Sequence, residues 1–285
     1  MLRRLPFSVS ESIMIGVSLG LALLEPARVR RAYAWAADGG AGERNPWAVV
    51  LRLLVHRARA LAATPRLGLL DPDQARCRLE VQGFERLDEA SQRGGVILLG
   101  FHVGQTAIHR SLALLGRSVT AISTGSGLRM PPPAAAWQAV FQRVGHEGWT
   151  EAEPGSRAVA LYRLSQIAAG GGIVMIMGSG GQGRVLFDLP LPGRPLAVRA
   201  GWFMLRRLTG LPTLPMLAHR AGGRWVVTIH PPLPGPDSDE HRDREACREA
   251  LGQILRDFVD RFPEQCVYLA MRSDERPPAP CGNLP

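Results

Sequence analysis

The residue in this sequence best suited to acid–base chemistry is His102. It follows an apolar run that predicts a strand over 96–101, and it precedes a stretch with helical periodicity over 104–115. At that place the partial positive charge of a helix N-terminus disfavours the protonated ring and lowers the imidazole pKa. A neutral imidazole near pH 7 is what a general base requires. The pattern therefore predicts His102 as a general base at the end of a strand.

The other residues that could carry chemistry give weaker patterns. His109 stands further along the same expected helix, but two histidines without further ligands do not make a metal site. The 4 cysteines are scattered without a C-x-x-C pair, which predicts free thiols in a reducing compartment. The turn 178–183 matches G-x-G-x-x-G, yet prolines follow where a nucleotide site needs a helix, so we expect it to shape the floor of a cleft. No metal and no tightly bound cofactor is expected.

The composition points to an anionic partner. The chain has 285 residues and a formal net charge of +9, and all of its 34 basic residues are arginines. Such a surface favours an anionic membrane or an acidic carrier protein. Aromatic residues make up only 6% and do not alternate with the basic ones, so nucleic-acid binding is not expected.

The N-terminal segment, residues 1–45, is predicted to be helical and to lie at a membrane interface. Its apolar run over 13–24 is shorter than the roughly 20 residues that span a bilayer. The charges over 25–31 disfavour a cleaved secretory signal and place arginines where anionic headgroups would lie. A helix packed on the protein's own core remains the alternative for this run.

Residues 46–285 are predicted to form one α/β domain. A helix is expected from 46 to about 65, and short apolar strands then alternate with helical stretches. The expected strands are 78–83, 96–101, 119–123, 173–177, 213–218 and 225–230, and the expected helices are 84–92, 104–115, 134–144, 156–169, 200–208 and 243–262. This alternation predicts a layered fold in which a central mixed sheet is flanked by helices.

Several blocks of the sequence resemble one known family. The stretch from Gly94 to Gln105 resembles the strand and histidine turn of the lysophospholipid acyltransferase superfamily, particularly its lipid A late (lauroyl/myristoyl) acyltransferase branch. The blocks 143–145, 183–195, 210–215 and 263–272 resemble later elements of that family in the same order. The resemblance covers roughly residues 5–272 and implies an acyltransferase-like fold. It also implies a histidine that deprotonates an acceptor hydroxyl, which then attacks an acyl thioester.

Two acidic residues of that family are absent here. Ala107 stands where the motif has Asp or Glu, and Gly178 stands where an aspartate often follows a strand. In the family the acidic residue of the histidine motif holds the other nitrogen of the imidazole. Gln105, Thr106 or a backbone carbonyl would have to orient His102 instead, or a carboxylate such as Asp188 or Glu147 would have to arrive from elsewhere. Otherwise the base is no longer used.

The resemblance also implies substrates and a location. An acyl-carrier-protein or coenzyme A thioester would be the co-substrate, and a hydroxyl or amine of a lipid or metabolite would be the acceptor. Arg143, Arg184 and Arg194 are the candidates for binding the phosphate of the donor. The expected location is peripheral, on the cytoplasmic face of the inner membrane. The alternatives are a non-catalytic partner subunit that binds an acyl chain or carrier protein, and a divergent enzyme that acts on a carrier-bound substrate.

Overall fold

The computed structural model describes residues 7–67, 73, 76–103, 119–123, 150–151, 157–179 and 183–272. The sequence predictions that fall outside these residues concern Gln105, Thr106, Ala107, His109, Arg143, Glu147 and the helices expected over 104–115 and 134–144.

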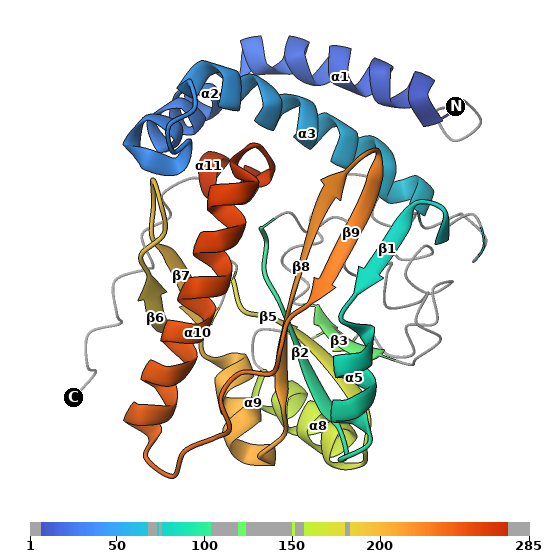
Figure 1. The fold of residues 1–285 in the computed structure, drawn as a ribbon, viewed down its shortest axis with the longest axis vertical. Coiled ribbons are helices and arrows are strands. Elements are labelled where there is room, and N and C mark those ends of the chain that lie inside the picture. Colours follow the sequence, from blue (N-terminus) through green and yellow to red (C-terminus); the bar gives the residue numbers. More distant parts are fainter. Residues whose placement is uncertain are drawn as a thin grey trace.

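A mixed sheet of seven strands forms the centre of the protein, in the order β1-β9-β8-β2-β5-β3-β4 (Figure 1). The strands are β1 (Leu79–Gln82), β2 (Val96–Gly100), β3 (Val119–Ser123), β4 (Thr150–Glu151), β5 (Ile173–Met177), β8 (Thr213–Ala221) and β9 (Arg224–Ile229). β2, β3, β4, β5 and β8 run parallel, whereas β9 is antiparallel to β8 and β1 is parallel to β9. The predicted α/β fold with a central mixed sheet is confirmed.

Helices cover both faces of this sheet because its central strands are apolar on both sides. All five residues of β2 are buried, which is typical of a parallel strand between two helical layers. Ile97 packs with α8 (Arg157–Ala169) and α9 (Gly201–Thr209) on one face. Val96 and Leu98 belong to the cluster that contains α5 (Phe84–Ser91) on the other.

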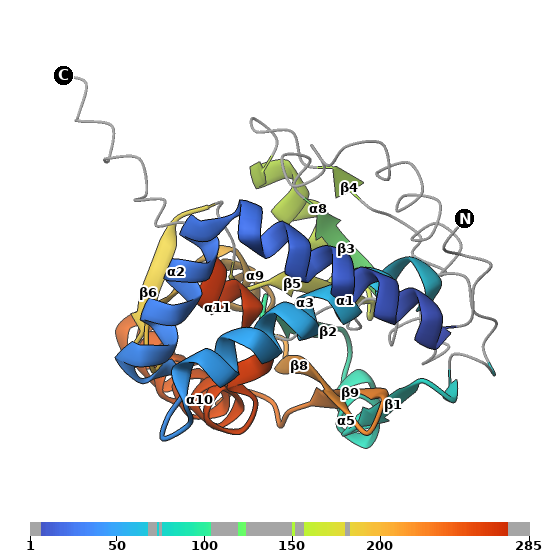
Figure 2. The same ribbon diagram turned by 90° about the horizontal axis from the view of Figure 1, so that it is seen from above.

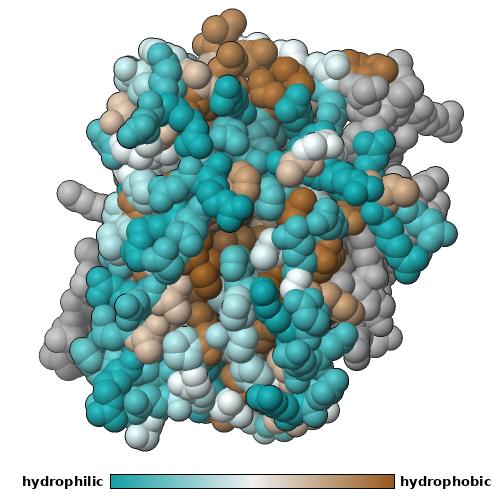
Figure 3. Space-filling view, viewed as in Figure 1, coloured by the Kyte–Doolittle hydropathy of each residue, from teal (hydrophilic) through white to brown (hydrophobic). Residues whose placement is uncertain are grey.

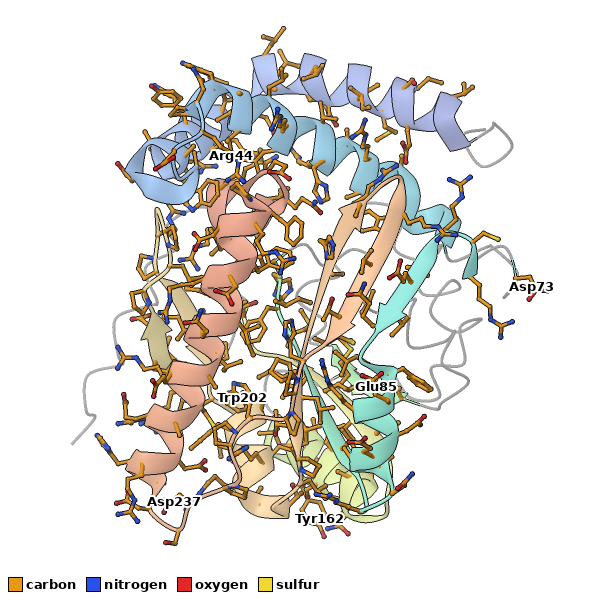
Figure 4. The ribbon with its side chains drawn as sticks, in the orientation of Figure 1. Arg44, Asp73, Glu85, Tyr162, Trp202 and Asp237 are labelled. Carbon is orange, nitrogen blue, oxygen red and sulfur yellow. The ribbon has the colours of Figure 1, made fainter. Side chains whose placement is uncertain are left out.

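The long helix α10 (Glu240–Arg261) encloses a further core beside the sheet. Its first turn is capped by Asp239, whose carboxylate accepts hydrogen bonds from the backbone N–H groups of His241 and Arg242. Trp202 of α9 is fully buried and lies inside the molecule between α10 and the sheet (Figure 4).

A β-hairpin that the sequence analysis did not predict follows β5. Its strands, β6 (Val185–Leu189) and β7 (Leu196–Arg199), pair antiparallel, and the prolines lie in the connection between them rather than in the strands. Gly193 in this connection has φ +74°, and a Cβ there would lie 2.4 Å from the carbonyl oxygen of Trp35. Only glycine fits at this approach, so the hairpin is fixed against the N-terminal helices.

The N-terminal helices cover one end of the sheet. α1 (Phe7–Leu24) lies along α3 (Pro46–Leu67), and α2 (Pro26–Trp35) with the π-helical turn η2 (Ala36–Gly40) connects them (Figures 1 and 2). α3 extends to Leu67, so the predicted end near residue 65 was slightly early. Among the described residues no single helix is long and apolar enough to cross a bilayer, and only the bent pair Glu11–Leu24 and Pro26–Gly40, at 96°, passes that test together.

The inner side of this N-terminal layer packs against the residues that flank His102 and against the last described helices. Ala32 and Trp35 are buried in the same core as Phe101 and Val103, which flank His102 in sequence. Two short C-terminal elements, η4 (Pro263–Gln265) and α11 (Val267–Met271), pack directly beneath α2 and α3. The residues around His102 are therefore enclosed by the sheet on one side and by α2, α3 and α11 on the other.

Candidate active site

His102 lies just beyond the carboxyl end of β2, as the sequence predicted. β2 pairs in parallel with β5, and Gly100 stands opposite Met177 at the ends of the two strands. Each strand continues for two residues in the same direction, to His102 and to Ser179. The carboxyl ends of neighbouring parallel strands open at one edge of a sheet, where α/β proteins commonly bind ligands.

Two short contacts join His102 to Ser179. The backbone N–H of His102 donates to Ser179 Oγ at 2.8 Å, and His102 Nδ1 lies 3.1 Å from the same oxygen. Ser179 is 3% exposed, whereas the His102 side chain is half-buried. The sequence analysis placed Ser179 only in a loop. The signal that could have found it is its position, two residues after β5, which mirrors that of His102 after β2.

An aromatic ring and a guanidinium complete the described surroundings of His102. The ring of Tyr268 on α11 lies 5.3 Å from the imidazole, centroid to centroid, at an interplanar angle of 31°. The guanidinium carbon of Arg272 lies 5.6 Å from the centroid of the Tyr268 ring, within the range of a cation–π contact. Tyr268 and Arg272 belong to the block 263–272 that resembles the acyltransferase family, but the sequence analysis assigned no role to either residue.

The imidazole of His102 is held neutral by its surroundings. Burial lowers the pKa of His102 from its usual 6.5, and a hydrogen bond to the backbone of Ser179 opposes this effect. The sequence analysis also predicted a lowered pKa, but from the N-terminus of a helix expected over 104–115, outside the described residues. Within the described part of the chain, desolvation is the main cause of the lowered pKa. A neutral ring at pH 7 has one lone pair with which to accept a proton.

A side chain at position 178 would crowd the side chains of Leu99 and Phe101. A Cβ on Gly178 would lie 2.8 Å from Phe101 Cε1 and 2.9 Å from Leu99 Cδ1. The backbone of Gly178 is also fixed, because its N–H donates to the Gly100 carbonyl and its carbonyl accepts from the Arg199 N–H, each at 2.8 Å. An aspartate here would require the Phe101 ring to move.

The arginines predicted to bind phosphate have different surroundings. Arg194 Nη1 donates to the carbonyl of Arg272 at 3.0 Å, and Arg272 Nη2 donates to the carbonyl of Pro195 at 2.6 Å, so Arg194 lies at the edge of the His102 site. Arg184 is exposed just before the first strand of the hairpin. Among the described residues, it is hydrogen-bonded to neither His102 nor Tyr268. Its carbonyl accepts a hydrogen bond from Ala200 N at 2.9 Å.

Asp188, one of the carboxylates considered as a replacement orienter, is exposed in β6. The described contacts of the imidazole are those to Ser179 and Tyr268 and include no carboxylate. An arginine that the sequence analysis did not select, Arg199, is hydrogen-bonded to the backbone of the site. Arg199 donates from its backbone to Gly178, next to Ser179, and its Nη1 donates to the carbonyl of Gly183 at 2.9 Å.

The remaining described histidines with shifted pKa values are part of the packing. His56 is buried beside Trp225, and burial together with Arg220 lowers its pKa to about 4. His219 lies within β8, and its ring stacks on that of Phe262 with the centroids 4.2 Å apart. Burial, followed by the charge of Arg86, lowers the pKa of His230 to about 4.

Within the ranges that the structure describes, no group of three or more His, Cys, Asp or Glu residues is arranged to hold a metal ion. No protein-family model matches this chain, and no curated protein matches it in sequence. The geometry of the His102 site therefore carries the functional argument.

Proposed function

We propose that this protein is an acyltransferase that moves a fatty acyl group from an acyl-carrier-protein or coenzyme A thioester to a hydroxyl or amine of a lipid or metabolite. The observation that carries the proposal is the half-buried, neutral imidazole of His102 at the carboxyl ends of β2 and β5. One ring nitrogen, Nδ1, faces Ser179, and among the described residues no group is hydrogen-bonded to Nε2. That nitrogen is suited to accept a proton from a substrate.

In this reaction the imidazole of His102 acts first as the base and then as the proton donor. His102 Nε2 takes the proton of the acceptor O–H or N–H as that atom attacks the thioester carbonyl. The C–S bond then breaks, and the imidazolium returns the proton to the departing thiolate. No redox or external reagent is required, because the proton that His102 takes from the acceptor is the proton that the thiol receives.

Positive charge near the site suits a phosphorylated donor. Arg272 lies beside Tyr268, and Arg194 is hydrogen-bonded to the backbone of Arg272. Guanidinium groups match phosphate oxygens such as those of a phosphopantetheine arm. Arg143 and Arg184 as further phosphate ligands, and Gln105 as a group that orients His102, stay predictions.

The outer surface of the N-terminal layer supports a location at a membrane. Val9, Ile13, Val17 and Leu21 recur every fourth residue along α1, and each is more than 40% exposed. Leu23 and Leu24 are 83% and 77% exposed. Hydrophobic surface is visible at the top of the molecule, where α1 lies (Figure 3). The exposed Trp47 packs against Tyr33 at 4.6 Å.

An apolar stripe with aromatic residues at its end and arginines nearby fits an anionic lipid surface. We place the protein peripherally on the cytoplasmic face of the inner membrane. The free thiols of Cys77, Cys247 and Cys266 fit a reducing compartment.

The test is product identification. The purified chain would be incubated with acyl-carrier-protein and coenzyme A thioesters of several acyl lengths, together with membrane-lipid acceptors in vesicles, and the products read by mass spectrometry. Free thiol together with an acylated acceptor supports the proposal. Thioester loss that yields only free fatty acid, or another product without acyl transfer, contradicts it.

A non-catalytic partner subunit is the second candidate. Two positions favour it, because alanine at 107 and glycine at 178 stand where the family has carboxylates. The side chains around Gly178 also crowd any side chain placed there. Tight binding of an acyl carrier protein without turnover on any donor would support this reading over the first.

A further inference from the structure

The usefulness of His102 as a base depends on which ring nitrogen carries the proton. A neutral imidazole has one N–H and one lone pair, and the partner of one nitrogen determines the state of the other. Position 107 is alanine, and position 178 accepts no side chain without a shift of Phe101. Within the described structure, the polar contacts of the His102 ring are made with Ser179.

The oxygen of Ser179 lies within hydrogen-bond distance of both the backbone N–H and the ring Nδ1 of His102. A hydroxyl has one proton and two lone pairs. One lone pair of Ser179 Oγ accepts the backbone N–H of His102 at 2.8 Å, and Nδ1 lies 3.1 Å from the same atom. The backbone N–H of His102 uses one lone pair of this oxygen, so the second lone pair is available to accept a hydrogen bond from a protonated Nδ1.

The position of Ser179 is fixed by the strands rather than by its own side chain. Gly178 is tied on one side to Gly100 at the end of β2 and on the other to Arg199 at the end of β7. Ser179 itself is 3% exposed. A serine held in this way has little freedom to turn away from the ring.

We propose that Ser179 is the positioning residue of the site and holds His102 with the proton on Nδ1 and the lone pair on Nε2. In other enzymes with a catalytic histidine, a carboxylate has this role. This inference rests on the proposed function of His102 as a base. Ser179 acts through the imidazole and does not touch the substrate. A neutral hydroxyl stabilises the imidazolium less than a carboxylate would, so catalysis without the acid is expected to be slower but not absent.

The alternative role for Ser179 is that of a nucleophile activated by His102. Its burial and its hydrogen bond from the His102 backbone oppose this role, because an attacking oxygen needs access to the thioester carbon. The two roles give different products, since only a nucleophile forms a covalent acyl-serine.

The first experiment reads the tautomer directly and does not depend on activity. The full chain is labelled with ¹⁵N-histidine, and the ring nitrogens of His102, assigned with His102→Gln, are observed by NMR. We expect Nδ1 protonated in the wild type and a mixture of tautomers in Ser179→Ala. Protonation of Nε2 in the wild type overturns the inference. A tautomer that changes with Gln105→Ala but not with Ser179→Ala also overturns it.

The second experiment measures turnover. Ser179→Ala is expected to lower kcat by about 100-fold with KM little changed, less than the roughly 10⁴-fold loss that follows removal of an orienting carboxylate. Ser179→Thr keeps the hydroxyl and is expected to recover much of the rate. The matched control is Ser165→Ala, since Ser165 is a buried serine on α8 whose hydroxyl donates to the carbonyl of Tyr162.

The outcomes separate the two proposals. An acylated Ser179 peptide, or a Ser179→Ala variant with wild-type kcat, overturns the positioning role. Absence of turnover with every donor defeats the proposed function, while the tautomer measurement still decides what Ser179 does to His102.

Discussion

Tyr268 packs its ring against His102, with the ring centroids 5.3 Å apart and the planes tilted by 31°. This contact joins the C-terminal helix α11 to the end of β2, two segments far apart in the sequence. It limits the directions in which the imidazole can turn, in addition to the hydrogen bond with Ser179. Ring contacts of this kind are worth about 0.5–1.5 kcal/mol.

The Tyr268 contact predicts different results for two substitutions. Tyr268→Leu removes the ring and is expected to lower kcat/KM by about 3- to 10-fold, the equivalent of about 1 kcal/mol. Tyr268→Phe keeps the ring and is expected to stay within about twofold of wild type. Steady-state kinetics on the two variants checks this. A larger loss in Tyr268→Phe than in Tyr268→Leu would show that the hydroxyl matters rather than the packing.

The ion pair between Arg206 and Asp243 is expected to be essential for stability. The two side chains meet at 2.7 Å and are 1% and 0% exposed, joining α9 to α10. Arg206→Met leaves Asp243 buried with the longer 3.6 Å contact to Arg207 and the weak 3.8 Å hydrogen bond from the Cys247 thiol, and should lower the free energy of unfolding by about 3–5 kcal/mol.

Urea denaturation of that variant is the measurement. Arg242→Ala serves as the control, since it breaks the exposed pair with Asp237 and is expected to cost far less stability than Arg206→Met. Equal losses in the two variants would show that burial does not set the cost of breaking these pairs.

Buried His56 predicts a loss of stability in mild acid. Its pKa falls from 6.5 to about 4 on folding, so the unfolded chain binds more protons between these pH values. The free energy of unfolding should therefore fall as the pH drops from about 6.5 to about 4, by up to about 3 kcal/mol from this group. His230, whose pKa is also about 4, adds to the loss with the same sign.

Urea unfolding across this pH range tests the assignment to His56. His56→Gln should flatten the curve, and substitution of the exposed His241 should not. A curve of unchanged slope in His56→Gln would place the acid sensitivity elsewhere.

The apolar stripe of α1 predicts binding to anionic vesicles. Leu24→Asp puts a charge on one of the most exposed leucines of the N-terminal layer, and co-sedimentation with phosphatidylglycerol-rich vesicles should weaken by about tenfold. Leu208→Asp is the matched control, because Leu208 is 69% exposed but lies on α9, at the opposite end of the molecule (Figure 1). Equal weakening in both variants would argue against α1 as the docking surface.

Restoring the missing acid is a further test of how His102 is held. If an unfilled orienting position limits catalysis, Ala107→Glu should raise activity. If Ser179 already holds Nδ1, as inferred above, the new carboxylate should be neutral or harmful. The kcat of Ala107→Glu, compared with that of Ala107→Gln, separates the two cases. A clear gain specific to the carboxylate would contradict the role given to Ser179.

The sequence predicted the parallel centre of the fold well, because apolar runs such as those of β2 and β5 are local signals. It missed the β6–β7 hairpin, since prolines at 190, 192 and 195 suggested a loop when they only flank the turn. It found His102 from its place after a strand. It did not select Ser179, whose contact with His102 depends on the register that sets Gly100 opposite Met177, a pairing between distant segments.

The central claim is that His102 is the base of a thioester-consuming enzyme. The most direct test is the rate of thiol release from acyl-carrier-protein and coenzyme A thioesters, in the presence of membrane-lipid acceptors, by the wild type, by His102→Ala and by His241→Ala, the last being an exposed histidine on α10. The account predicts turnover by the wild type and by His241→Ala that falls by at least about 100-fold in His102→Ala. Turnover that survives in His102→Ala would contradict it.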